Sequence, residues 1–143
     1  MTDDPPGKVV FTRRFVLGDR GQIARMQRLV LGALKRQQYD SASRFAIRLA
    51  LGEALANAFT HGNRDDPTKA VRLECRIDSS TVVLDVQDAG EGFEPQAVPD
   101  PAEPENLEIP CGRGIVLMRS YMTEVTFHPP GNRVRMMYRK RRD

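Results

Sequence analysis

The sequence predicts a two-layer α/β sandwich of the α+β type, in which a mixed, mostly antiparallel sheet carries about three helices on one face. The length of 143 residues is that of one domain and is sufficient to bury a core without disulfides. Stretches with the apolar period of a strand and stretches with that of a helix follow the order β-α-α-β-β-loop-α-β-β. This order lacks the strict strand–helix alternation of a doubly wound parallel sheet, so mostly antiparallel pairing is expected.

Composition and charge exclude several classes of protein. Hydrophobic residues make up 40% and charged residues 29% of the chain, which is typical of soluble globular domains. No run approaches the roughly 18 apolar residues of a membrane span, so we expect no membrane contact. The net charge of +3 is too small to indicate a nucleic-acid partner by itself. Cys75 and Cys111 lack a CxxC spacing and the first residues lack a secretory signal, which predicts a reduced, cytoplasmic protein.

The first elements are a strand and a helix. Residues 1–7 are polar and contain a Pro-Pro pair, so we expect a flexible lead before a single domain at residues 8–143. That domain is expected to open with a strand at residues 8–17. From Asp19 onwards the apolar residues recur at helical spacing, which predicts a helix with one apolar face: Ile23, Met26, Val30, Ala33 and Leu34.

The second helix is expected to be the central one. Asp40 or Ser41 can cap its first amides, and Gly62, which lacks a Cβ, suits its end. Two apolar stripes run along it, made of Phe45, Leu49, Ala56 and Phe59 on one side and of Ile47, Leu51, Leu55 and Ala58 on the other. A helix that is apolar on two sides packs against several elements, so its polar residues are expensive to bury.

A hairpin and a long loop follow this helix. Apolar and polar residues alternate over residues 71–77 and 82–86 with a Ser-Ser turn between them, which predicts two antiparallel strands that end at Asp88. Residues 89–111 hold five prolines and several acids, so no regular element fits and a long loop is expected.

The C-terminal part reads as a helix and two strands. Helical spacing resumes over residues 115–122, and a Pro-Pro-Gly-Asn turn at 129–132 separates two short strands. Basic residues are concentrated at this end of the chain: Arg133, Arg135, Arg139, Lys140, Arg141 and Arg142. We interpret them as a solvated edge strand and tail, with attraction of an acidic partner or of nucleic acid as the alternative.

Two polar residues of the second helix form the first motif. Glu53 and Asn57 are separated by one helical turn, so their side chains point the same way. Ala46 and Ala50 continue the same stripe, and their small size is expected to leave room for a ligand. Taken alone, an E-x-x-x-N pair more often caps or pairs locally on a solvated face.

The second motif is Asp-Ala-Gly-Glu-Gly-Phe at residues 88–93. An acid at the end of a strand, followed by Gly90 and Gly92, lets the backbone turn sharply and approach a flat ligand closely. Asp88 could then accept a hydrogen bond from an exocyclic amine. The alternative for this motif alone is an ordinary tight Asp-Gly turn.

The third motif closes the long loop and opens a helix. At Cys111-Gly112-Arg113-Gly114 the free amides and the dipole of the helix start favour phosphate, glycine permits close approach, and Arg113 adds positive charge. The alternative is a glycine hinge that merely restarts the helix. A dinucleotide fingerprint is excluded because Leu117 stands where its third glycine belongs, and no GxxxxGK[ST] loop occurs.

The three motifs together carry a resemblance. EALANAFTHGN at residues 53–63, DAGEGF at 88–93 and GRGIVLMRSYMTEV at 112–125 closely resemble the boxes of the histidine-kinase-like ATPase superfamily. Within it, the sequence is similar to the anti-sigma factor serine kinases. The resemblance extends over nearly the whole chain from Lys8, and it implies the histidine-kinase-like ATP-binding fold with ATP and Mg²⁺ as cofactors.

Roles for the first two motifs follow from this resemblance. Asn57 is implied as the magnesium ligand through its amide oxygen, and Glu53 as the general base for an attacking serine hydroxyl. Asp88 is implied to bind the exocyclic amine of adenine, while Gly90 and Gly92 give the purine clearance.

The resemblance assigns further nucleotide contacts. Phe93 is implied to begin a loop that closes over the nucleotide, and Gly112, Arg113 and Gly114 to hold the triphosphate. We also expect Thr126, on the following strand, to reach the adenine edge through water. His61 and Asn63 match the end of the first box; a histidine at a helix end is more often structural, and neither residue is assigned to catalysis.

The function that these roles imply is an ATP-dependent serine/threonine protein kinase that acts as an anti-sigma factor in a partner-switching system. Its partners would be an anti-anti-sigma protein, which it phosphorylates, and a sigma factor or similar regulator, and the resemblance implies a homodimer without direct nucleic-acid binding. The alternative is a non-catalytic module that uses nucleotide only to set its shape and sequester a regulator. Nucleic-acid binding through the basic end ranks last.

Overall fold

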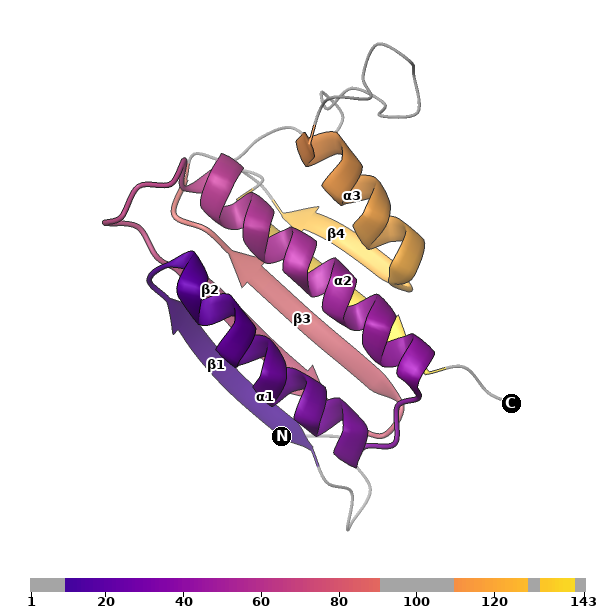
Figure 1. The fold of residues 1–143 in the computed structure, drawn as a ribbon. Coiled ribbons are helices and arrows are strands. Elements are labelled where there is room, and N and C mark those ends of the chain that lie inside the picture. The colour runs from indigo at the N-terminus through magenta and orange to yellow at the C-terminus, as the bar shows by residue number, and fades with distance from the viewer. Residues whose placement is uncertain (1–9, 91–109, 129–131, 141–143) are drawn as a thin grey trace.

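A five-stranded antiparallel sheet with helices on one face makes up the computed structural model (Figure 1). The described residues are 10–90, 110–128 and 132–140, and the side chains of 110–113 are not among them. The strand order is β1-β2-β3-β5-β4, and every pair of neighbours runs antiparallel. The predicted two-layer α+β class is therefore confirmed, and the parallel pairing that we had allowed for is not found among the described strands.

The strands alternate between a buried and an exposed face. Their bounds are β1 Phe11–Leu17, β2 Val71–Ile77, β3 Thr81–Gln87, β4 Glu124–His128 and β5 Arg133–Arg139. The β2–β3 hairpin is the one that the sequence predicts. Its turn is held by the Asp78 carboxylate, which accepts the backbone N–H groups of Ser80 and Thr81 at 2.8 Å each.

The helices agree with the predicted periodicity. A short 3₁₀ turn, η1 (Arg20–Gln22), precedes α1 (Ile23–Arg36), and α2 (Ser41–Asn57) continues into a π-helical turn, η2 (Ala58–Gly62). The Asp40 carboxylate accepts the Ser43 N–H at 2.7 Å, which confirms the predicted cap. The third helix, α3 (Pro110–Tyr121), begins at Pro110, earlier than the predicted residue 115; proline suits the first turn of a helix.

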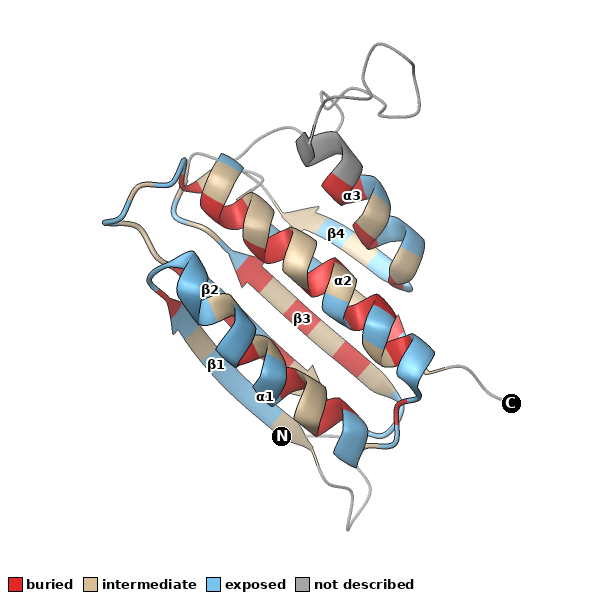
Figure 2. Ribbon diagram, viewed as in Figure 1, coloured by how far each residue is buried: buried red, intermediate tan, exposed pale blue. Residues whose placement is uncertain are grey.

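Helix α2 occupies the centre of the helical layer, between α1 and α3 (Figure 1). Figure 2 shows buried residues along α2 and along the strands behind it. Ile47, Leu51 and Leu55 are at most 1% exposed, as expected for a helix packed on several sides. Phe45, which we had placed on a packing stripe, is 48% exposed and meets Tyr121 of α3 edge-on, with 6.1 Å between ring centroids.

Two expectations about surfaces were wrong. Ala46 and Ala50 are buried, so protein fills the stripe where we expected room for a ligand, because α3 packs along this side of α2. The basic strand β5 is not an edge strand, since β4 pairs on its outer side. Residues Arg141 and Arg142 of the basic end lie outside the described residues.

Candidate functional site

The end of the second helix and the loop after β3 meet at two glycines. A Cβ at Gly62 would overlap the carboxylate of Asp88, and a Cβ at Gly90 would overlap the backbone carbonyl of Gly62. A larger residue at position 90 would force the two segments apart, and one at position 62 would displace the Asp88 carboxylate. The first and second motifs are therefore in direct contact, although they are separated in sequence by a turn and two strands.

The buried side chain of Asn63 stabilises the contact between the end of the second helix and the loop after β3. Its side chain is 1% exposed, and its Oδ1 accepts the backbone N–H of Ala89 at 2.7 Å. Its Nδ2 donates to the carbonyl of Ala70 at 3.1 Å. One buried amide thus joins the end of η2, the entry to β2 and the loop after β3, a role that the sequence did not reveal.

Asn132 holds the same loop from the other side. Its backbone carbonyl accepts the N–H of Asp88 at 2.9 Å, and its side-chain Nδ2 donates to the Asp88 carbonyl at 3.3 Å. The Gly90 N–H donates to Oδ1 of Asp88 at 2.7 Å. Asn132 therefore holds the backbone of Asp88, and the Gly90 N–H holds one oxygen of its carboxylate.

The environment of Asp88 favours a hydrogen bond between its carboxylate and a ligand donor. Burial raises the pKa of its carboxyl above the ordinary value, against the opposing effects of the Gly90 N–H and of the Lys69 charge. A partly desolvated carboxylate is costly to leave underpaired, so a ligand N–H that reaches it is bound more strongly than at the open surface.

The third motif packs against the first. A Cβ at Gly114 would lie 2.5 Å from Nδ2 of Asn57 and 3.2 Å from Oε2 of Glu53. The carboxylate and the amide of α2 thus face the first turn of α3, as the one-turn spacing predicts. Glycine at position 114 permits this approach, and the start of α3 brings free backbone amides to the same place.

A set of polar contacts anchors the turn at the end of the second helix. The Arg20 guanidinium donates to the Thr60 hydroxyl and to Oδ1 of Asp65, the latter at 2.7 Å. Arg64 and Asp65 adopt left-handed φ angles of 53° and 55°, which turn the chain away from η2 toward β2. These contacts keep η2, and with it Gly62, against the loop of Asp88.

Thr126 does not lie beside Asp88 or the other residues of the candidate site. Val125 and Phe127 of β4 pack against the core, and Arg119 of α3 stacks over the Phe127 ring at 5.8 Å. Thr126 is exposed and is paired with Arg135, so it points to the sheet face without helices. Our placement of Thr126 at the adenine edge is wrong, because successive residues of a strand point to opposite faces.

Of four other predicted site residues, two are not described and two are described only by their backbone. Gly92 and Phe93 lie outside the described residues. Gly112 and Arg113 belong to the first turn of α3, but their side-chain positions are not described.

The donor groups fit magnesium better than a transition metal. Among residues 10–90, 110–128 and 132–140 there is no group of three or more His, Cys, Asp or Glu side chains that could hold a metal ion. Magnesium takes oxygen ligands and keeps several of its waters, so one or two protein oxygens with substrate phosphates are enough. The Asn57 amide can supply such an oxygen.

Comparison with known proteins identifies the class of domain. Residues 17–138 match the histidine kinase-like ATPase domain family. The chain belongs to this family, which confirms the resemblance inferred from the three motifs and makes nucleotide binding the expected activity of the site.

The chain is similar to three anti-sigma F factors. That of Anoxybacillus flavithermus (strain DSM 21510 / WK1) is 31% identical over 90 residues, which is 60% of either chain. Those of Geobacillus stearothermophilus and Geobacillus kaustophilus (strain HTA426) are each 29% identical over 97 residues, which is 66% of either chain. The match therefore spans less than two thirds of each relative. Within the described residues, no helix combines the length and apolarity needed to cross a membrane.

Proposed function

We propose that this chain binds ATP with Mg²⁺ and acts as a serine/threonine protein kinase that is also an anti-sigma factor. The observation that supports this most is the convergence of three motifs, with Gly62 and Gly90 against Asp88 and Gly114 against Asn57 and Glu53. The relatives named anti-sigma F factor support the regulatory part of the proposal.

Recognition of adenine is assigned to Asp88. Its carboxylate accepts the exocyclic N–H of the base, which guanine cannot offer at the same position. The Gly90 N–H holds Oδ1 of the carboxylate, and Asn132 holds the backbone of Asp88. Glycine at position 90 permits the close contact with the Gly62 carbonyl that keeps this loop in place.

Proton transfer is assigned to Glu53. Its carboxylate accepts the proton of the attacking serine hydroxyl, and Asn57, one turn further along α2, offers its amide oxygen to the metal. Asn57 would hold the magnesium ion, which would supply positive charge against the negative charge that develops during transfer. The backbone amides of the α3 start and the Arg113 side chain are assigned to the triphosphate.

The partners are proposed from the resemblance and from the names of the relatives. The substrate would be a serine of an anti-anti-sigma protein, and the sequestered regulator a sigma factor or similar protein. We propose that the protein works as a homodimer in the cytoplasm, without direct contact to nucleic acid.

A phosphotransfer assay with two variants tests the proposal. ATP, Mg²⁺ and a cognate antagonist protein should give phosphoserine with the wild type, and Glu53→Ala should abolish transfer while ATP still binds. Glu124→Ala, which removes an exposed carboxylate on β4, is the matched control and should transfer normally. Nucleotide-dependent capture of the partner with no transfer by the wild type would instead identify a non-catalytic interaction module.

A further inference from the structure

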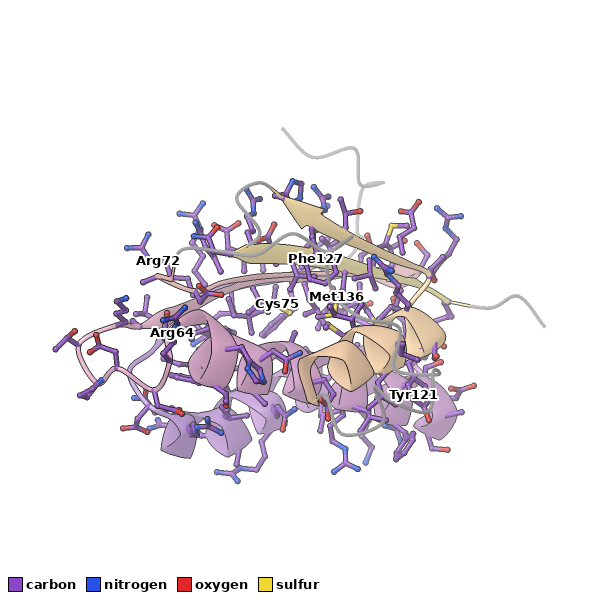
Figure 3. All side chains as sticks on the ribbon, turned by 90° about the horizontal axis from the view of Figure 1, so that it is seen from above. Arg64, Arg72, Cys75, Tyr121, Phe127 and Met136 are labelled. Atoms are coloured by element: carbon purple, nitrogen blue, oxygen red, sulfur yellow. The ribbon has the colours of Figure 1, made fainter. Side chains whose placement is uncertain are left out.

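The sheet has a second face that none of the described helices covers. Side chains that point away from the core form this open face, which β4 extends with Thr126 among others. Its members on β1, β2, β3 and β5 are Thr12, Arg14, Val16, Arg72, Glu74, Arg76, Thr81, Val83, Asp85, Gln87, Arg133, Arg135, Met137 and Arg139. Figure 3 shows Arg72 on this side of the sheet, whereas Cys75 and Met136 lie between the sheet and the helices. The nucleotide motifs lie on the opposite side, so the open face is a separate surface.

The open face is hollowed near its centre. A depression of about 270 Å³ is lined by Arg14, Arg76, Arg133 and Arg135 together with Glu74 and Asp85. Strand register explains the arrangement, because Arg14, Glu74, Asp85 and Arg135 lie opposite one another across the four strands. The hollow is therefore a charged one, in which arginine predominates.

Each of the two carboxylates that line the hollow is paired with an arginine, one of them strongly and the other weakly. Arg133 donates twice to Asp85, at 2.7 Å to each oxygen, and the Asp85 side chain is only 12% exposed. Its charge is thus satisfied inside the surface. Arg14 and Glu74 approach to 3.1 Å with side chains 83% and 59% exposed, and such a pair opens at little cost.

Two arginines on this face are available to a partner. Arg72 and Arg135 are exposed, and neither guanidinium makes a hydrogen bond or ion pair with any residue that the structure describes. Each guanidinium presents a planar set of donors that matches a carboxylate in a bidentate manner. The open face therefore offers positive charge that no described carboxylate neutralises, on two neighbouring parts of one sheet.

The chemistry of the face distinguishes between occupants. A second copy of the same face would bring arginine against arginine, which is unfavourable. A single-stranded nucleic acid would find no Phe, Tyr or Trp for base stacking among the open-face residues, and Glu74 would repel its phosphates. Carboxylates have neither disadvantage, because they pair with Arg72 and Arg135 and can displace Glu74 from Arg14.

We propose that the open face is a docking surface for an acidic segment of a partner protein, whose carboxylates pair with Arg72 and Arg135. The docking does not require nucleotide or phosphotransfer, because the surface is the face of the sheet that points away from the helices and their motifs. Association should be fast at low salt and should weaken as salt screens the charges.

Fluorescence anisotropy with two labelled probes of equal length tests the proposal. The probes are an oligoglutamate and an oligothymidylate, titrated with the intact chain at low and at moderate salt. Oligoglutamate should bind more tightly, and Arg72→Glu/Arg135→Glu should weaken its binding about tenfold or more. The matched control Arg25→Glu/Arg28→Glu makes the same charge change on exposed positions of α1 and should alter the affinity by less than about twofold.

Other outcomes would overturn the proposal. Equal losses in the two variants would mean that only net charge matters, and tighter binding of oligothymidylate would identify a nucleic-acid surface. Self-association that the Arg72→Glu/Arg135→Glu variant abolishes, without oligoglutamate binding by the wild type, would identify an interface between copies. Circular dichroism of both variants checks that they are folded, and a single Arg135→Gln variant, expected to show a smaller loss, replaces the double variant if that one unfolds.

Discussion

The buried side chain of Asn63 accepts the backbone N–H of Ala89 at 2.7 Å, so a residue at the end of the second helix holds the loop that carries Asp88. The same amide donates to the Ala70 carbonyl at 3.1 Å. Adenine recognition as proposed here therefore depends on a side chain that need not touch the nucleotide. Asn63 is a positioning residue, and its effect should reach the ligand through Asp88.

Asn63→Ala is expected to destabilise the fold and to weaken ATP binding. The substitution removes the partner of the Ala89 N–H and of the Ala70 carbonyl in two partly buried hydrogen bonds, which costs about 1–2 kcal/mol of unfolding free energy. Urea unfolding measures this loss, and calorimetric titration measures the change in affinity.

Asn63→Asp separates positioning from simple stability. It keeps the oxygen that accepts the Ala89 N–H, so it should recover part of the ATP affinity. Stability should not recover in parallel, because the variant buries an ionisable carboxyl whose second oxygen faces the Ala70 carbonyl. A variant Asn63→Ala that is as stable as wild type, or that binds ATP equally well while folded, would contradict the positioning role.

Asp88→Asn should raise the stability of the nucleotide-free protein at neutral pH. Burial raises the pKa of the Asp88 carboxyl above its ordinary value of 3.8, so the folded state holds the proton more tightly than the unfolded chain. The stabilising contribution of this group is complete below pH 3.8 and is lost as the pH rises through the raised pKa. Asparagine removes this loss, and the difference in melting temperature between variant and wild type should widen across that pH window.

The same substitution should weaken ATP binding about tenfold or more, because the ligand then loses a charged acceptor. In the wild type, ATP affinity should fall on acidification at a pH above 3.8, where Asp88 gains its proton. Glu124→Gln on β4 is the control and should leave the affinity unchanged. Equal ATP affinity of Asp88→Asn and wild type would refute the assignment of adenine recognition to this residue.

Gly114→Ala should disrupt the contact between α3 and α2. Its methyl group would lie 2.5 Å from the Asn57 amide and 3.2 Å from Glu53, so the helices must separate or these side chains must move. We expect a loss of about 1–3 kcal/mol of unfolding free energy together with weaker binding of Mg²⁺–ATP.

Gly32→Ala is the matched control for that change. It lies within α1, where the added methyl group meets only Arg36 Nη1 at an ordinary 3.5 Å. Alanine should stabilise this helix by about 0.5–1 kcal/mol. If both variants gain stability and bind Mg²⁺–ATP as the wild type does, the close approach of Gly114 to Asn57 has no functional role.

The regular elements and much of the site could be predicted from the sequence, because their signals are local. The period of two over residues 71–77 predicts β2, and Asp40 before an apolar run predicts the start of α2. The one-turn spacing of Glu53 and Asn57 correctly predicts that both face the same place. Asp88 stands at the end of a strand before a glycine, which is visible without a structure.

The predictions failed for residues whose position depends on contacts between segments far apart in the sequence. Asn132 reaches Asp88 only because β5 pairs with β3, a partnership between strands far apart in the chain. Thr126 was misplaced for the same reason, since the face that it occupies depends on how β4 pairs with β5. The buried role of Asn63 likewise depends on a contact with Ala89, and no periodic signal reports it.

Calorimetric titration of the wild-type chain with ATP and Mg²⁺, repeated with GTP and with ATP in the absence of metal, tests the central claim most directly. The account predicts one saturable site per chain for Mg²⁺–ATP, weaker binding without metal, and affinity for GTP reduced by about tenfold or more. Absence of saturable heat with Mg²⁺–ATP, or equal affinities for the two nucleotides, would contradict a single adenine-specific site built from the three motifs.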